Sequence, residues 1–245
     1  MMKKKNTFTK YISIAIILLV GTLFVAKFGG PSLLKLYVEA GIGTCQKIPV
    51  LCMTPTPEII SPEIEKEYTA ELLTYEFPTM SIKLPKDFTV IQERIKKVYY
   101  KRNKRQHQGN VVYLLHKGPN FFINLFPQLT KQGIKDNYEF IKRTMYADLK
   151  GIKNLTDAFF VIMKGIFIPD LGDLKDVKMA QFKLTDRRGF INYNFTASGN
   201  YFDCNIMDNA GNFFKIYIKD KGASLNLDKL LAILSSVKAI GESPQ

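Results

Sequence analysis

The hydrophobic pattern of the chain begins with one long apolar run near its start. Sixteen consecutive residues without a charge separate Lys10 from Lys27. A membrane-spanning helix needs about 20 apolar residues, and lysines at both ends can extend toward the headgroups. We therefore predict a transmembrane signal anchor over residues 11–28. A cleaved secretory signal is the alternative, but the small residues that cleavage requires are missing just after the run.

Further along the chain, the period of the pattern separates strands from helices. Alternating apolar and polar residues predict strands, whereas apolar residues three or four positions apart predict helices. Strands are expected at residues 80–84, 88–90, 95–101, 111–116, 121–126, 191–195, 202–206 and 214–218. Helices are expected at residues 61–75, 136–151 and 227–237, and a further helix is expected to begin at Pro31. Asp136, with Glu139 three residues on, predicts a capping box at the start of the second of these helices. The proline pair Pro55 and Pro57 predicts an extended linker.

The last third of the chain carries the clearest pattern. Three successive strands alternate apolar residues with the polar residues Asn192, Asn194, Asp203, Asn205 and Lys215. Each strand is expected to have one dry face, covered by the leucine-rich final helix, with Cys204 as a buried free thiol. The predicted fold class is α+β, an antiparallel sheet covered by helices (an α-β-α sandwich), with one N-terminal transmembrane helix.

The element order carries a family resemblance. The run Met80-Ser81-Ile82-Lys83-Leu84-Pro85-Lys86-Asp87-Phe88, the middle helix and the final hairpin with its leucine-rich helix resemble the PsbP-like group of α-β-α sandwich domains. The resemblance covers residues 77–240 and implies a non-catalytic accessory domain that binds a larger assembly. The chain departs from that pattern in its anchor and in an insertion at residues 155–178.

The charge distribution predicts how the chain is oriented in the membrane. Four lysines and no acidic residue precede the apolar run, so the positive-inside bias keeps the N-terminus in the cytoplasm. We expect a cytoplasmic basic segment at residues 1–10, the anchor at 11–28, a juxtamembrane segment and linker at 29–60, and an extracytoplasmic α+β domain at 61–245. The net charge of +13 favours anionic partners or anionic lipid.

Three cysteines in an exported chain suggest one disulfide and one odd thiol. Cys45 and Cys52 are the natural pair, because they bracket a short segment in which Pro49 can turn the chain. A redox-active pair is the alternative, but the two-residue spacing that lowers a thiol pKa is absent. The sequence therefore predicts a small disulfide loop just outside the membrane.

Two surface features allow both a structural and a functional interpretation. A basic patch with two tyrosines inside it consists of Arg94, Lys96, Lys97, Lys101, Arg102, Lys104 and Arg105. It is either a solvated strand pair or a surface that grips phosphates or lipid headgroups. Phe159 and Phe160 open an apolar stretch that is too short to cross a bilayer. That stretch is either core or a contact with a membrane or partner.

No pattern of residues declares a reaction. Asp170, Asp173 and Asp176 do not match a calcium loop, and His107 and His116 lack neighbours at zinc-ligand spacing. The chain contains no nucleophile elbow, phosphate loop or dinucleotide fingerprint. We expect no cofactor, no metal and no catalytic residue.

These observations favour a single-pass membrane protein that presents an extracytoplasmic accessory or assembly domain. The expected partners are the membrane and a protein in a membrane-associated assembly. We expect the domain itself to catalyse no reaction. One alternative is an extracytoplasmic hydrolase or thiol redox enzyme. Another, for an inverted topology, is a membrane-tethered domain that binds nucleic acid, which the predicted topology disfavours.

Overall fold

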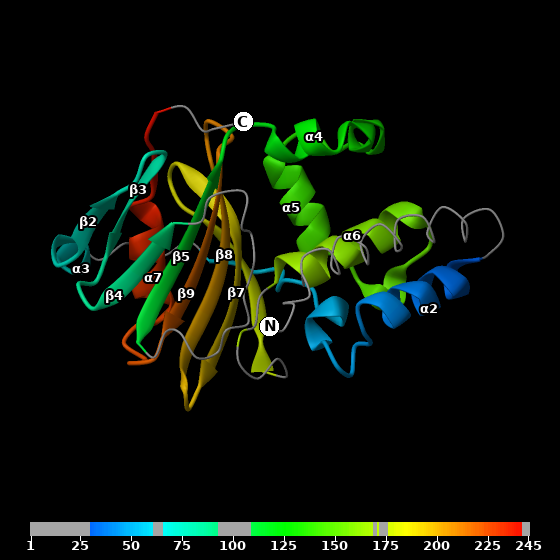
Figure 1. Cartoon of the computed structure of the whole chain (residues 1–245), viewed down its shortest axis with the longest axis horizontal. Coiled ribbons are helices and arrows are strands. Elements are labelled where there is room, and N and C mark those ends of the chain that lie inside the picture. Colours follow the sequence, from blue (N-terminus) through cyan, green and yellow to red (C-terminus); the bar gives the residue numbers. More distant parts are fainter. Residues whose placement is uncertain (1–29, 61–65, 93–108, 169–170, 172–175, 242–245) are drawn as a thin grey trace, which may run out of the picture. The chain divides into compact units, whose positions relative to one another are not determined.

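The computed structural model describes residues 30–60, 66–92, 109–168, 171 and 176–241 (Figure 1). These residues divide into two compact units. The helical unit contains residues 30–54 and 146–168, and the sheet unit contains residues 55–145 and 171–241. Residues 146–168 thus fold with a segment about one hundred positions earlier, a pairing that the sequence did not predict.

The helical unit is built from two helices and two short 3-10 turns. Its elements are α2 (Pro31–Gly41), η1 (Pro49–Cys52), η4 (Leu149–Gly151) and α6 (Leu155–Phe167). Pro31 suits the start of α2, because its missing N–H would have no helical partner there. Asn154 caps α6, and its Oδ1 accepts from the Asp157 N–H at 3.0 Å. A Cβ on Gly165 would meet Ile42 at 2.8 Å, so glycine permits a close approach between the end of α2 and α6.

The sheet unit is organised around one large mixed sheet. Its strand order is β1 (Ile59–Ile60), β6 (Lys178–Lys183), β7 (Arg187–Thr196), β8 (Gly199–Asp208), β9 (Phe213–Asp220), β5 (Asn110–Lys117) and β4 (Phe88–Gln92). The central strands from β6 to β5 pair antiparallel, as predicted. The β4–β5 and β1–β6 pairs are parallel, however, so the expectation of a wholly antiparallel sheet was wrong. Parallel neighbours need a connection of about a dozen residues or more, and residues 93–109 supply that length between β4 and β5.

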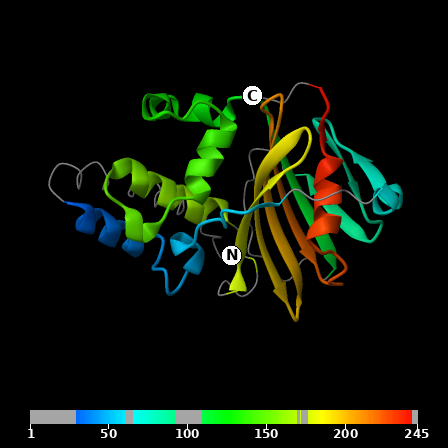
Figure 2. The same cartoon turned by 180° about the vertical axis from the view of Figure 1, so that it is seen from behind.

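A small second sheet and helix α7 (Leu227–Ser235) cover one face of the large sheet. The small sheet has the order β10 (Lys238–Ala239), β3 (Met80–Leu84) and β2 (Leu73–Glu76). Figure 2 shows α7 beside the large sheet, next to β2 and β3. The apolar residues of the central strands, including the buried free thiol of Cys204, form one core with Leu230, Leu231 and Leu234 of α7. The predicted dry face and the helix that covers it are therefore confirmed.

Helix α5 (Asn137–Met145) packs against β7 and β8, and it begins at the predicted capping box. The Glu139 N–H donates to Asp136 Oδ1 at 2.8 Å. In Figure 1, α5 and α7 lie on opposite sides of the large sheet. The polar residues of the central strands therefore face α5 rather than open solvent.

Three local predictions were wrong. The helix expected at residues 136–151 ends at Met145, and residues 149–151 form the separate 3-10 helix η4 of the helical unit. A helix was expected at residues 61–75. Among the described residues of this range, only Lys66–Ala70 form a helix, α3, and Tyr75 lies in β2. The strand expected at 121–126 is instead α4 (Phe121–Leu125), followed by the 3-10 helix η3 (Pro127–Gln132). Asn137 Oδ1 accepts from the Phe122 N–H at 3.1 Å, and buried Phe122 stacks on Phe140 at 4.2 Å. These contacts hold the first turn of α4 against α5.

Several predicted features lie outside the described residues. They are the span at 11–28, the strand at 95–101, the basic patch, His107, Asp170 and Asp173. Within the ranges that the structure describes, no helix is long and apolar enough to cross a membrane.

Candidate functional site

The structure accounts for some of the predicted site residues. Phe160 is buried in α6 with 1% of its surface exposed, whereas Phe159 is half-buried and meets it edge-on at 5.2 Å. Asp176 is exposed, and no cluster of metal-ligating side chains occurs within the described ranges. Phe160 thus lies below the surface, while Phe159 is only partly covered.

Cys45 and Cys52 lie at disulfide distance in the helical unit, with Cα atoms 5.6 Å apart. They join the segment that follows α2 to the end of η1, and both pack against the core of that unit. Cys204 is fully buried, and burial raises the pKa of its thiol well above the ordinary value. The predicted pairing and the predicted odd thiol both agree with these positions.

A buried polar cluster lies on the side of the large sheet that faces α5. Asp203 of β8 and Lys215 of β9 form an ion pair at 2.6 Å, and both side chains are almost completely buried. Lys215 Nζ also donates to Asn205 Oδ1 at 3.2 Å. Asn192 Nδ2 of β7 donates to Asp203 Oδ2 at 3.0 Å. We call these four residues the sheet cluster.

Strand register brings the sheet cluster together. Asn192 pairs directly with Asp203, and Asn205 pairs directly with Lys215, so the four side chains occupy two adjacent rows of one sheet face. Asn192 Nδ2 additionally lies 3.7 Å from the sulfur of Met145 in α5. The sequence showed these polar positions but not their burial.

The chemistry of the sheet cluster is that of a buried ion pair. A carboxylate and an ammonium group taken out of water cost several kcal/mol each, unless they pair and make further hydrogen bonds. Here the pair is neutral overall, and the two asparagines bond to it on both sides. Because Asp203 is 0% exposed, its carboxylate is not presented to a substrate, and the cluster instead joins β7, β8 and β9 to one another.

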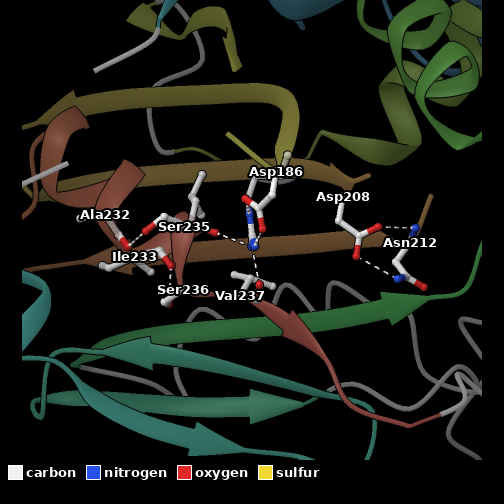
Figure 3. Close-up of polar contacts among 10 residues, drawn as sticks. Asp186, Asp208, Asn212, Ala232, Ile233, Ser235, Ser236 and Val237 are labelled. Carbon is white, nitrogen blue, oxygen red and sulfur yellow. Dashed lines mark hydrogen bonds and ion pairs between the residues drawn. The ribbon is translucent and has the colours of Figure 1, made fainter. Parts of the chain in front are cut away.

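Arg187 forms a second polar centre at the end of α7, with Asp186 and Val237, which are labelled in Figure 3. Its guanidinium donates to the carbonyl oxygen of Leu234, in the last turn of α7, at 3.0 Å, and to that of Val237, two residues after the helix ends. Asp186 accepts from Arg187 Nε at 2.8 Å, and this contact lowers the pKa of the Asp186 carboxyl. Arg187 therefore caps α7 and connects it to the start of β7.

His116 lies in β5 on the core side of the sheet. It is buried and stacks on Phe214, with ring centroids 4.7 Å apart. Burial lowers the pKa of His116, so the ring is neutral at physiological pH. This position indicates a core histidine and not an acid–base group at a surface.

Lys164 is the most unusual charged residue of the helical unit. It lies in α6 and is fully buried, and its Nζ donates to the carbonyl oxygens of Met53 and of Ala147, the latter at 2.8 Å. Burial lowers its pKa to about 7, and the nearby carboxylate of Asp148 opposes this shift. A neutral amine can act as a nucleophile, but this one is enclosed. Its two bonds instead fasten the segments that lead into and out of the helical unit.

Comparison of the chain with family models, with curated proteins and with solved structures finds no match. The resemblance to PsbP-like domains therefore stays a prediction.

Proposed function

We propose that this protein is a membrane-anchored accessory or assembly subunit. Its extracytoplasmic α-β-α sandwich binds a protein partner or an anionic surface and catalyses no reaction. The observation that carries the proposal is the position of Cys45 and Cys52 at disulfide distance, shortly after the predicted anchor. Disulfides persist in oxidising compartments, so this pair supports the predicted orientation with the C-terminal region outside the cytoplasm.

The buried charges support a binding role over a catalytic one. In the sheet unit, Asp203, Lys215 and Arg187 all serve internal contacts that join strands or cap a helix. The net charge of +13 nevertheless gives the chain a positive field that attracts anionic partners. The PsbP-like resemblance implies the same kind of role, a domain that docks onto a larger assembly.

Counting the free thiols of the protein tests the compartment. We expect a maleimide polymer to label only Cys204 when the protein is denatured without reduction, and all three cysteines after reduction. The C45S variant is the matched control and should expose Cys52 without reduction. External protease should also digest the sheet unit in spheroplasts. Three labels without reduction, together with protection from protease, would contradict the proposal and favour the inverted, cytoplasmic alternative.

Charge neutralisation tests the anionic partner. The test replaces Lys101, Arg102, Lys104 and Arg105 together with glutamine in the full-length protein. This variant should bind more weakly to the partner that crosslinking identifies in native membranes, with the largest loss at low salt. The reason is that a patch with fewer cations releases fewer counterions on binding. The matched control replaces Lys131 and Lys135, two exposed lysines outside the patch, in the same way. Equal binding across the salt range would exclude the patch.

A further inference from the structure

Helix α2 has an apolar face that the helical unit does not bury. Leu33 is 50% exposed and Leu36 is 59% exposed, and Ala40 follows on the same side of the helix. Leu34 and Val38, on the opposite side, are buried in the core of the unit. Burying one leucine side chain stabilises by about 1.5–3 kcal/mol. The exposed parts of Leu33 and Leu36 could therefore contribute further stabilisation if another apolar surface covered them.

The distance from the predicted anchor identifies what this face meets. The anchor ends at Phe28, and α2 begins three residues later at Pro31. An extended chain advances at most about 3.6 Å per residue, so the start of α2 lies within about 11 Å of the end of the span. The headgroup layer on each side of the hydrocarbon is about 5–8 Å thick. A helix tethered this closely begins within the headgroup layer or a few ångströms outside it.

We propose that α2 lies along the outer surface of the bilayer, with Leu33, Leu36 and Ala40 turned into the boundary between headgroups and acyl chains. Lys35 and Glu39 lie together on one side of this face, 4.0 Å from each other. An amphipathic helix of this kind binds through its apolar area and through cations near the lipid phosphates. This inference rests on the proposed anchor and adds a second membrane contact to it.

The chain contains no tryptophan, so one introduced residue reports its own surroundings. The full-length L36W variant is reconstituted into phosphatidylcholine vesicles with or without bromine on the acyl chains. We expect its emission to shift to shorter wavelength and to lose most of its intensity in the brominated vesicles. L73W is the matched control, because Leu73 of β2 is 51% exposed and belongs to the sheet unit. Its emission should stay at long wavelength and unquenched.

Alkaline extraction of the same vesicles separates this inference from the proposed function. If the protein resists extraction but L36W stays unquenched, the lipid contact of α2 is wrong and the anchor stands. If alkali releases the protein, both the anchor and the α2 contact are wrong. Equal quenching at Leu73 would also overturn a contact that is specific to α2. Protection of the buried thiol of Cys204 from maleimide under native conditions verifies that the sheet unit of each variant is folded.

Discussion

Replacing Asp203 with alanine is expected to destabilise the sheet unit by about 3–5 kcal/mol, because it leaves the Lys215 ammonium buried without its counter-charge. This is a large share of the 5–15 kcal/mol that stabilises a typical domain. Urea unfolding of the full-length protein in detergent, followed by a signal from the sheet unit, measures the change. D176A is the matched control, because Asp176 is exposed, and it should change the free energy of unfolding by less than about 0.5 kcal/mol.

A double variant distinguishes the loss of the ion pair from the cost of leaving one buried charge without its partner. Replacing Asp203 with asparagine and Lys215 with methionine removes both charges, and such neutral replacements of buried pairs are often tolerated. We expect the double variant to be more stable than D203A by about 2 kcal/mol or more. A D203A protein as stable as the unaltered chain would show that the Lys215 ammonium reaches water, contrary to its burial.

The stability of the helical unit should increase with pH above neutrality because of Lys164. The pKa of Lys164 is about 7 in the folded protein, against an ordinary value of 10.5. Between these values the unfolded chain binds more protons, so the free energy of unfolding increases with pH by about 3–5 kcal/mol in total. Below about pH 7 both states are protonated, and this contribution to the pH dependence disappears.

Urea unfolding of the helical unit at about pH 7 and about pH 9.5 tests this slope. The K164M variant should lose most of the pH dependence, because methionine does not titrate. Two opposing effects decide the stability of K164M at pH 7. The variant no longer buries a titratable amine, but the carbonyl oxygens of Met53 and Ala147 lose their hydrogen-bond donor. K150M removes an exposed lysine of η4 and should keep the slope of the unaltered protein. An equal slope in K164M would contradict a neutral buried amine.

The parts of the fold that the sequence predicted are those in which local pattern and packing agree. Ile191, Cys204 and Ile216 stand at alternating positions, and the sheet places them directly opposite one another. The capping signal at Asp136 and Glu139 is local as well, and its hydrogen bond forms as expected. The spacing of Cys45 and Cys52 likewise predicted their proximity.

Long-range packing explains what the sequence did not show. The short apolar run at 121–126 suits a strand as well as a helix, and the bond from Phe122 to Asn137 decides for the helix. Asn192 and Asp203 looked like solvent-facing positions, because nothing local reveals that α5 covers them. Lys164 was visible as the single charge within an apolar stretch, which is a sequence signal for a buried cation that the prediction did not use.

The pairing of β5 with β9 affects how the protein is made. These strands join residues 110–117 to residues 213–220, and β5 has only β4 on its other side. A ribosome adds about 5–20 residues per second, so β5 waits roughly 5–20 seconds for its central neighbour to emerge. During synthesis the nascent chain therefore carries an unpaired strand edge rich in valine and leucine, which a chaperone or the translocation machinery must shield from aggregation.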